Sequence, residues 1–517
     1  MSRALNRRVF LASSAAVASG LALQSAAPAS AATSAPRVPD IDVRKAAQQD
    51  PSEATLAEAV VLMRRGKLTS ATLTEAYLER IQQYDTTYQA YAEVTGETAL
   101  AAARKADRGQ GAGGVLRGIP LCIKDNYFTK GVPTRCNSYI FEDFVPDEDA
   151  TAVARLKAAG GIVLGKGQMG PLATTRATQP NGTVTTVNAW TPDDPSVDPG
   201  GSSTGPACSV AGRMASSSIG TQTGGSIVLP SNQQNLTGLK PTMGRVSIHG
   251  IIPLTFTRDH AGPLARDAMD AALMLQVMAG PDSQDPRTLG LPAVPDLVKA
   301  ATPVVAKGVR MRRATKIGVP ADFLSAQKQL RGAFLDTLDS IPGATLVEVA
   351  YPADWTLLTG TFNAARLAER TEPFRHWLRA DPAKFGVSLL TWLQGLMLSG
   401  DEWITAQRAK NHLLREILDG VMDRCDVILQ TGPVPFDILG LPEIAFPIGF
   451  DDSGVPVGAI LGGQPYEEDR LLEVAAAYQA VTDWHTRRPA DPGAALTMKA
   501  ATARPQLSAE EAAEASA

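Results

Sequence analysis

The sequence predicts an α/β protein. Short apolar segments typical of buried strands alternate along the chain with longer segments in which apolar residues recur at helical spacing. Of the 517 residues, 44% are hydrophobic and 20% are charged, which is the composition of a globular protein with ample material for a large core. Length alone would allow roughly two to four domains, so the domain number stays open at this level.

The first third of the chain alternates helices and strands. We expect helices over residues 55–84, 98–106 and 150–159, and strands over 115–126 and 161–165. Gly66 and Lys67 interrupt the first helical range, after which Thr69 or Ser70 can cap a second helix. The strand over 115–126 is apolar and carries Lys124 near its end.

A long loop is predicted over residues 178–203, because this range lacks apolar periodicity and is dense in Pro, Asp, Asn, Gly and Thr. Long loops inside compact domains are usually functional. Small residues over 206–214 suit a closely packed helix, and residues 216–220 bring the chain to a second glycine-rich turn.

The remaining elements continue the α/β pattern. An amphipathic helix is predicted over 267–279, and strands over 317–320 and 345–349 flank a helix as in a βαβ unit. Residues 354–424 are mostly helical and hold four tryptophans that either line a pocket or belong to the core: Trp355, Trp377, Trp392 and Trp403. The pattern ends with strands over 427–429 and 444–447, the segment 454–458, and a helix over 469–481.

Both ends of the chain have the composition of segments outside a folded domain. Arg7-Arg8-Val9-Phe10-Leu11, an apolar run to Leu23 and Ala29-Ser30-Ala31 follow the order of an export signal, and the arginine pair favours the twin-arginine route. The alternatives for this segment are a helical anchor or a chance pair of arginines. We therefore expect residues 1–31 to be an export signal, 32–50 a flexible lead-in and 496–517 a disordered tail. The expected location is secreted, periplasmic or at the cell envelope, with no stable membrane span once the signal is removed.

Charge and metal-ligand content limit the partners that the sequence predicts. A net charge of -4 gives no electrostatic reason to expect nucleic acid. Four cysteines are too few for a disulfide scaffold in so long a chain, and we expect all of them to be small buried residues: Cys122, Cys136, Cys208 and Cys425. With five histidines and no Cys-x-x-Cys or His-x-x-x-His spacing, the sequence predicts no metal and no other cofactor.

Two glycine turns that carry serine lie close together, Gly200-Gly201-Ser202-Ser203-Thr204-Gly205 and Gly220-Thr221-Gln222-Thr223-Gly224-Gly225-Ser226. With Lys124 upstream, they supply an oxygen nucleophile, a proton relay, a base, and backbone N–H groups for a developing oxyanion. A lysine in an apolar strand can be neutral near pH 7, because burial disfavours the ammonium form. Two alternatives remain: the turns are linkers, or Lys124 pairs with a carboxylate such as Asp125.

The first turn also allows a second interpretation. Gly201-Ser202-Ser203-Thr204-Gly205 matches the Gly-x-Ser-x-Gly elbow of α/β-hydrolases, which would make Ser203 the nucleophile of an esterase. His485 and several acidic residues follow in the order that this mechanism requires. However, the elbow should follow a buried strand, whereas Ser203 follows a polar loop.

Taken in this order, the motifs resemble those of the amidase signature family, and of its peptide-amidase-like subgroup. The matching stretches are residues 116–126, 200–205, 220–230, 238–242 and 259–266, with weaker similarity over 55–107 and 426–476. The resemblance implies one amidase signature domain over residues 51–495, with a large twisted mixed β-sheet flanked by helices and a late helical insertion. Residues from about 290 to 425 would be the variable, mostly helical region that shapes the substrate pocket.

The resemblance also implies a catalytic triad. Lys124 would be the base, Ser202 the relay on a cis peptide bond, and Ser226 the nucleophile. The oxyanion would be held by the backbone N–H groups of Thr223, Gly224, Gly225 and Ser226. Ser203 would support the network by hydrogen bonding.

Three positions depart from the family's pattern. The family commonly has Asp at Gln222, Arg at Val228 and a glycine near Asn235. Val228 removes a positive charge close to the nucleophile, so we expect neutral amides, peptide amides, or aryl and fatty amides rather than small acidic substrates.

The resemblance leaves three functional hypotheses. The first is an exported amide hydrolase, working as a monomer or homodimer on a small-molecule or peptide amide and releasing a carboxylate with ammonia or an amine. The second is the catalytic subunit of a tRNA-dependent amidotransferase, which needs partner subunits. The third is a noncatalytic binding protein on the same scaffold, which the joint presence of Lys124, Ser202 and Ser226 disfavours.

Overall fold

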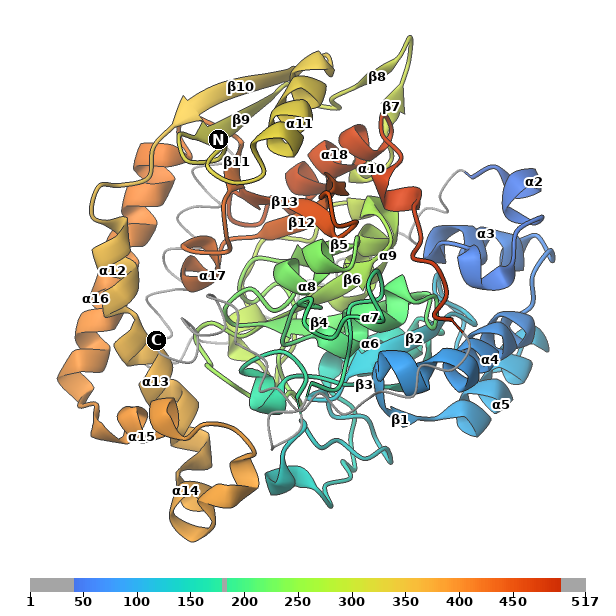
Figure 1. Ribbon diagram of the computed structural model, residues 1–517, viewed down its shortest axis with the longest axis horizontal. Coiled ribbons are helices and arrows are strands. Elements are labelled where there is room, and N and C mark those ends of the chain that lie inside the picture. The colour runs from blue at the N-terminus through green and yellow to red at the C-terminus, as the bar shows by residue number, and fades with distance from the viewer. Residues whose placement is uncertain (1–40, 179–183, 494–517) are drawn as a thin grey trace.

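The computed structural model describes residues 41–178 and 184–493 (Figure 1). The expected export signal and tail, residues 1–31 and 496–517, lie outside the described residues. Residues 41–50 belong to the expected flexible lead-in, yet they hold helix α2 (Val43–Ala46), whose first N–H groups donate to the Asp42 side chain. This end of the lead-in is therefore helical rather than extended.

Within the described residues, eleven strands form one mixed sheet in the order β1-β3-β2-β4-β6-β5-β12-β13-β11-β9-β10. The strands β3, β2 and β4 run parallel to one another, as do β11, β9 and β10, and the other neighbours are antiparallel. The α/β fold around a large mixed sheet is thus confirmed. The strands are β1 (Tyr91–Val94), β2 (Pro120–Lys124), β3 (Ile162–Gly167), β4 (Ser217–Gln222), β5 (Thr237–Lys240), β6 (His260–Ala265), β9 (Thr315–Pro320), β10 (Ala344–Val349), β11 (Val427–Gln430), β12 (Glu443–Phe450) and β13 (Pro456–Gly463), with β7 (Val304–Val305) and β8 (Val309–Arg310) paired apart from it.

Helices flank the sheet, and their ends follow capping chemistry. Helix α3 begins with a capping box between Thr55 and Glu58, and Thr69 rather than Ser70 caps α4 by accepting from the Thr72 N–H. These helices are α3 (Leu56–Arg64), α4 (Ser70–Tyr88), α5 (Gly96–Asp107), α6 (Thr151–Ala158), α7 (Thr204–Ala211), α8 (Val228–Gln233), α9 (Ala268–Met278), α10 (Leu297–Ala300), α11 (Lys328–Ser340), α17 (Phe436–Leu439) and α18 (Glu468–Gln479). The βαβ unit predicted over 317–349 is confirmed, because α11 connects the parallel strands β9 and β10.

Two predicted helices differ from the structure. Helix α7 begins at Thr204, directly after the first serine pair, rather than at residue 206. Helix α9 is buried on most of its surface rather than along one stripe, since eight of its eleven residues are buried. It was predicted as amphipathic, but α3, α6, α10 and α18 pack around it and leave little of it exposed to solvent.

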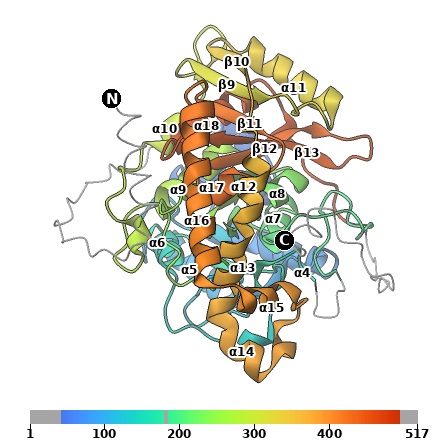
Figure 2. The same ribbon diagram turned by 90° about the vertical axis from the view of Figure 1, so that its left-hand side faces the viewer.

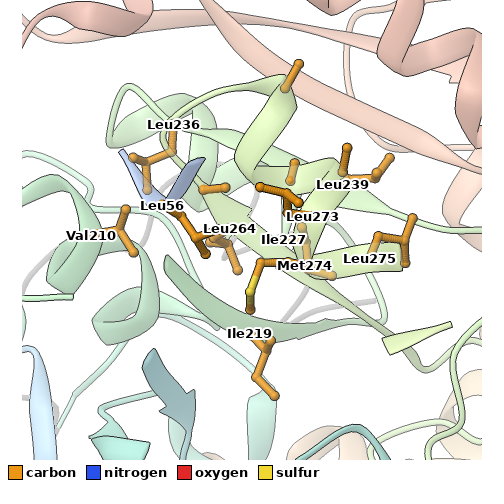
Figure 3. Packing of buried hydrophobic residues seen from close by; sticks show 14 of the residues in the cluster. Leu56, Val210, Ile219, Ile227, Leu236, Leu239, Leu264, Leu273, Met274 and Leu275 are labelled. Carbon is orange, nitrogen blue, oxygen red and sulfur yellow. The ribbon is translucent and has the colours of Figure 1, made fainter. Parts of the chain in front are cut away.

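The core at the middle of the sheet covers both faces of β4 and β6, since Leu264 pairs with Ser218 and therefore points to the opposite face from Ile219. Figure 3 labels Ile219 of β4, Leu239 of β5, Leu264 of β6, Leu273 and Met274 of α9, and Ile227. All six of these side chains are fully buried. Ile227 directly follows Ser226, so the second serine turn is anchored in the core by its neighbour.

The late helical region forms a separate layer at one side of the molecule (Figures 1 and 2). It comprises α12 (Trp355–Thr361), α13 (Asn363–Thr371), α14 (Arg375–Ala380), α15 (Leu390–Met397) and α16 (Gly400–Arg415). Trp392 is a core residue of this layer, with its ring 5.2 Å from that of Phe374 and 5.0 Å from that of Phe385. Trp403, by contrast, lines a cavity of about 470 Å³ with Glu369 and Arg375.

Candidate functional site

Strand order brings Lys124 to the second serine turn. Lys124 is the last residue of β2, and β4 runs parallel beside it, with Ile123 opposite Ile219. Parallel neighbours end at the same edge of a sheet, so the turn that follows Gln222 of β4 lies at the edge where Lys124 ends β2. The first serine pair joins them there, because the hydroxyl groups of Ser202 and Ser203 lie within hydrogen-bond distance of Lys124 Nζ.

The Lys124 side chain is fully buried and contacts three hydroxyl groups. Its Nζ lies 2.9 Å from Ser202 Oγ, 3.0 Å from Ser203 Oγ and 2.9 Å from Thr221 Oγ1. The Asp125 carboxylate does not serve as the expected alternative partner, because its Oδ1 lies 3.3 Å from the Nζ of Lys166 on β3. The lysine therefore faces the serines, as a base for their protons must.

Glycine is required where the two serine turns approach other parts of the chain. A Cβ atom on Gly201 would lie 2.6 Å from the Arg176 backbone, and one on Gly220 would lie 2.6 Å from Ser203 Oγ. Both distances are too short for any side chain. The peptide bond between Gly201 and Ser202 is cis, as the resemblance implied.

Accessibility separates the members of the candidate triad. Ser226 is 6% exposed, whereas Ser202 is 1% exposed and Lys124 and Ser203 are fully buried. A nucleophile must reach a bound substrate, while a relay and a base act behind it. The order of exposure therefore matches the order of roles that the resemblance implied.

The turn from Thr223 to Ser226 keeps its backbone N–H groups available. Within residues 41–178 and 184–493, no protein atom accepts a hydrogen bond from these four groups. The next two N–H groups, those of Ile227 and Val228, donate to Gln222 Oε1 at 3.0 and 3.1 Å. The four free donors are the ones that the resemblance implied for an oxyanion hole.

Asp259 fixes the other end of this turn. Its carboxylate accepts from Thr223 Oγ1 and from the backbone N–H groups of Leu254 and Thr255, at 2.8 and 3.0 Å for the last two. Burial raises the pKa of Asp259. Sequence reasoning gave this residue no role, although Asp259 begins one of the stretches that carry the resemblance.

The elbow interpretation of Ser203 fails on geometry. Ser203 is fully buried, follows a loop rather than a strand, and contacts Lys124. His485 lines a different cavity, of about 330 Å³, together with Asp267 and Arg488. The contact of Ser203 with Lys124 is compatible with the supporting role that the resemblance implied.

Two of the three departures from the family's pattern face inward rather than toward a substrate. Val228 is fully buried and packs with Ala445 and Ile460, and Gln222 is fully buried behind the turn. The argument from Val228 to a neutral substrate thus loses its physical basis. Asn235 has a positive φ of 59° and donates from Nδ2 to the Trp484 carbonyl, so it takes a backbone conformation that glycine usually supplies.

The remaining expectations concern metal sites, the four cysteines and helices that could cross a membrane. The described part of the chain contains no group of three or more His, Cys, Asp or Glu that could hold a metal ion. All four cysteines are buried thiols outside any disulfide, which confirms the prediction that they are small buried residues. Of the helices in the described ranges, none combines the length and apolar character needed to cross a membrane.

Comparison with known proteins agrees with this geometry. A family model described as Amidase matches residues 72–432. A glutamyl-tRNA(Gln) amidotransferase subunit of Chloroflexus aggregans is 34% identical over 490 residues, covering 84% of this chain and 98% of that protein.

Solved structures extend the match to the whole fold. The native peptide amidase of Stenotrophomonas maltophilia aligns with a TM-score of 0.73 and 28% identity, over 86% of this chain and 99% of that one. An amidase family protein of Bacillus anthracis aligns with a TM-score of 0.73 and 27% identity, over 88% of this chain and 95% of that one. This chain therefore belongs to the amidase signature family and is an enzyme that hydrolyses the C–N bond of amides.

Proposed function

We propose that this enzyme is an exported amidase that cleaves carboxamides through an acyl-enzyme on Ser226. The observation that carries the proposal is the contact of 2.9 Å between the buried Nζ of Lys124 and Ser202 Oγ. It lies at the edge of the sheet where the turn from Thr223 to Ser226 presents four unbonded N–H groups to an oxyanion.

Acylation starts with two proton transfers. Neutral Lys124 accepts the Ser202 hydroxyl proton while Ser202 accepts the proton of Ser226, and the Ser226 oxygen attacks the amide carbon. The N–H groups of residues 223–226 stabilise the tetrahedral oxyanion, each contributing about 3 kcal/mol by analogy with other serine hydrolases.

The intermediate collapses when the C–N bond breaks. The proton held by Lys124 passes back through Ser202 to the departing nitrogen, which leaves as ammonia or an amine. Water then attacks the acyl-enzyme, gives its proton to the same relay and releases the carboxylate, so Ser226 regains its hydroxyl. In each half-reaction the relay takes up one proton and gives it away again, first to the departing nitrogen and then to the Ser226 oxygen, so Lys124 is neutral at the end of both.

For the substrate we propose a carboxamide, with C-terminally amidated peptides as the first class to test. The support is the structural likeness of 86% of this chain to the peptide amidase of Stenotrophomonas maltophilia. Aryl and primary amides belong to the same screen, because the acyl-enzyme chemistry is common to all of them.

The second candidate function is that of an amidotransferase component, which the curated relatives favour. They are named as a subunit of glutamyl-tRNA(Gln) amidotransferase, at 30 to 34% identity in the most similar cases. Such a component would need its partners, whereas an amidase would turn over amides alone. Partner subunits recovered with the native protein, together with no hydrolysis by the isolated chain, would support this second function.

The decisive experiment uses the purified mature chain with a panel of amidated peptides, primary amides and anilides. We expect turnover without partners, covalent labelling of Ser226 by a fluorophosphonate, and loss of both in Ser226→Ala. Unchanged hydrolysis by folded Ser226→Ala would disprove the assignment of the nucleophile.

Export is tested separately. The basis is the order Arg7-Arg8-Val9-Phe10-Leu11, apolar run and Ala29-Ser30-Ala31. We expect replacement of Arg7 and Arg8 by lysine to retain the protein inside the cell, and the N-terminus of the exported form to begin near residue 32. Equal export of the lysine variant would rule out the twin-arginine route.

A further inference from the structure

We propose that Gln222 is a positioning residue for catalysis: its carboxamide, oriented by Glu443, holds the nucleophile turn in its oxyanion-binding shape. The inference rests on the proposed role of Ser226, and it assigns a role to a pair of residues that lies behind the turn. Neither side chain reaches a substrate, since both are fully buried.

Four strand ends meet behind the turn. Gln222 ends β4, Lys240 ends β5, Gln430 ends β11, and Glu443 begins β12. Glu443 lies at their centre, because it accepts from Gln222 Nε2 at 3.0 Å and from Gln430 Nε2 at 3.2 Å. The Nζ of Lys240 lies 3.4 Å from the same Glu443 oxygen that Gln222 contacts.

The other half of the Gln222 carboxamide acts on the turn. Its Oε1 accepts the N–H groups of Ile227 and Val228, where helix α8 begins. Those two donors are thereby directed away from the site, while the N–H groups of residues 223–226 stay unbonded within the described part of the chain. The carboxamide thus determines which peptide groups remain available to the oxyanion.

The chemistry at position 222 requires one acceptor and one donor. A carboxylate there could still accept from Ile227 and Val228, but it would lack the N–H group that Gln222 donates to Glu443. Burial already raises the pKa of Glu443 to about 8. A second buried carboxyl in contact with it would meet like-charge repulsion as well as the cost of burial. The Gln222 carboxamide, as donor, and the Glu443 carboxyl, as acceptor, therefore complement each other at these two positions.

The turn is held at both ends by different elements. Gln222 holds the end at residues 227 and 228, and Asp259 holds Thr223 at the other end. Loss of the contacts at either end would allow the N–H groups of residues 223–226 to rotate away from the oxyanion. A displacement of about 1 Å in a catalytic group can cost about 100-fold in rate.

The test compares variants of two glutamines that contact the same carboxylate. Gln222→Met removes the contact with Glu443 and the contacts with the turn, whereas Gln430→Met removes only a contact with Glu443. We expect Gln222→Met to lower kcat about 100-fold with KM changed less than about threefold. Gln430→Met should keep kcat within about threefold. Thermal unfolding of both variants separates a loss of folding from a loss of positioning.

A reciprocal exchange provides the second measurement, and it uses variants of nearly unchanged shape. Gln222→Glu alone should lower kcat by at least about tenfold, because the donor to Glu443 is lost. Adding Glu443→Gln restores one donor and one acceptor between the two positions and should recover most of that loss. Fluorophosphonate should label Ser226 more slowly in Gln222→Glu than in the parent, and the double variant should recover most of the lost labelling rate.

Two results would overturn the proposal. One is an equal fall of kcat in folded Gln222→Met and Gln430→Met, which would mean that the network acts on stability alone. The other is a double variant no better than Gln222→Glu. Failure of the proposed function is distinguishable, because it would appear as activity in Ser226→Ala whatever the Gln222 variants do.

Discussion

The Nζ of Lys124 lies 2.9 Å from Ser202 Oγ, and both side chains are shielded from solvent. We expect Lys124→Met, which keeps the length and apolar stem, to lower kcat/KM by about 1,000-fold, because the relay loses its base. Steady-state hydrolysis of the best amide of the panel gives this number.

A matched control for this lysine lies on the neighbouring strand. Lys166 is equally buried but pairs with Asp125. Lys166→Met should therefore lower the thermal unfolding midpoint, since it leaves a buried carboxylate unpaired, and should affect turnover less than Lys124→Met does. A folded Lys124→Met variant with kcat/KM within tenfold of the parent would exclude Lys124 as the base.

Ser202 and Ser203 test the assignment of the relay. Both hydroxyls lie within hydrogen-bond distance of Lys124 Nζ, at 2.9 and 3.0 Å, so distance alone does not separate them. We expect Ser202→Ala to cost about 1,000-fold in kcat and Ser203→Ala about tenfold, because Ser203 supports the network without passing the proton. Parallel kinetics of the two variants decide the point, and the reverse ranking would make Ser203 the relay.

Residue types were enough to single out the two glycine turns and Lys124 as a candidate site, but the order of their roles, with Ser202 rather than Ser203 as the relay, came only from the resemblance to the amidase signature family. Alternation of strands and helices likewise predicted the α/β class. The partners that hold the site could not be found in this way. Glu443 lies 221 residues after Gln222, and only the pairing of β5 with β12 brings that strand to the turn. Val228 was misread for a related reason, since sequence does not tell which way a side chain faces.

Variants of Thr223 test whether the contact between Thr223 and Asp259 also positions the turn over residues 223–226. The Thr223 hydroxyl donates to Asp259. Thr223→Val keeps the shape but removes this bond, so we expect kcat to fall about tenfold with little change in KM. Thr223→Ser keeps the hydroxyl and should retain most activity. If the valine and serine variants have the same kcat, the Asp259 contact does not position the turn.

Val228 tests the claim that this position stabilises the protein rather than selecting the substrate. Its side chain packs with Ala445 and Ile460. We expect Val228→Ala to lower the free energy of unfolding by about 2 kcal/mol, through lost apolar burial and the cavity left behind. The ratio of kcat/KM for a neutral amide to that for an acidic amide should not change. A shift of this ratio by tenfold would return Val228 to the substrate pocket.

Asp85 gives the stability of the fold a dependence on pH. Its carboxylate accepts from the Ala90 N–H at 2.7 Å, and burial raises its pKa from 3.8 to about 6. The folded state therefore binds the proton more tightly than the unfolded state does, so this group's contribution to stability is complete below about pH 4. That contribution is lost as the pH rises through about 6, and it amounts to at most about 3 kcal/mol.

Asp85→Asn removes this titration while keeping an oxygen that can accept from Ala90. We expect the variant to match the parent near pH 4 and to exceed its thermal unfolding midpoint increasingly up to pH 7, because only the parent must ionise a half-buried carboxyl. Unfolding midpoints of both proteins across this range supply the test. Because both proteins share every other titrating group, the difference between the two curves isolates Asp85. A difference that is constant with pH, or that grows toward acid, would contradict the raised pKa.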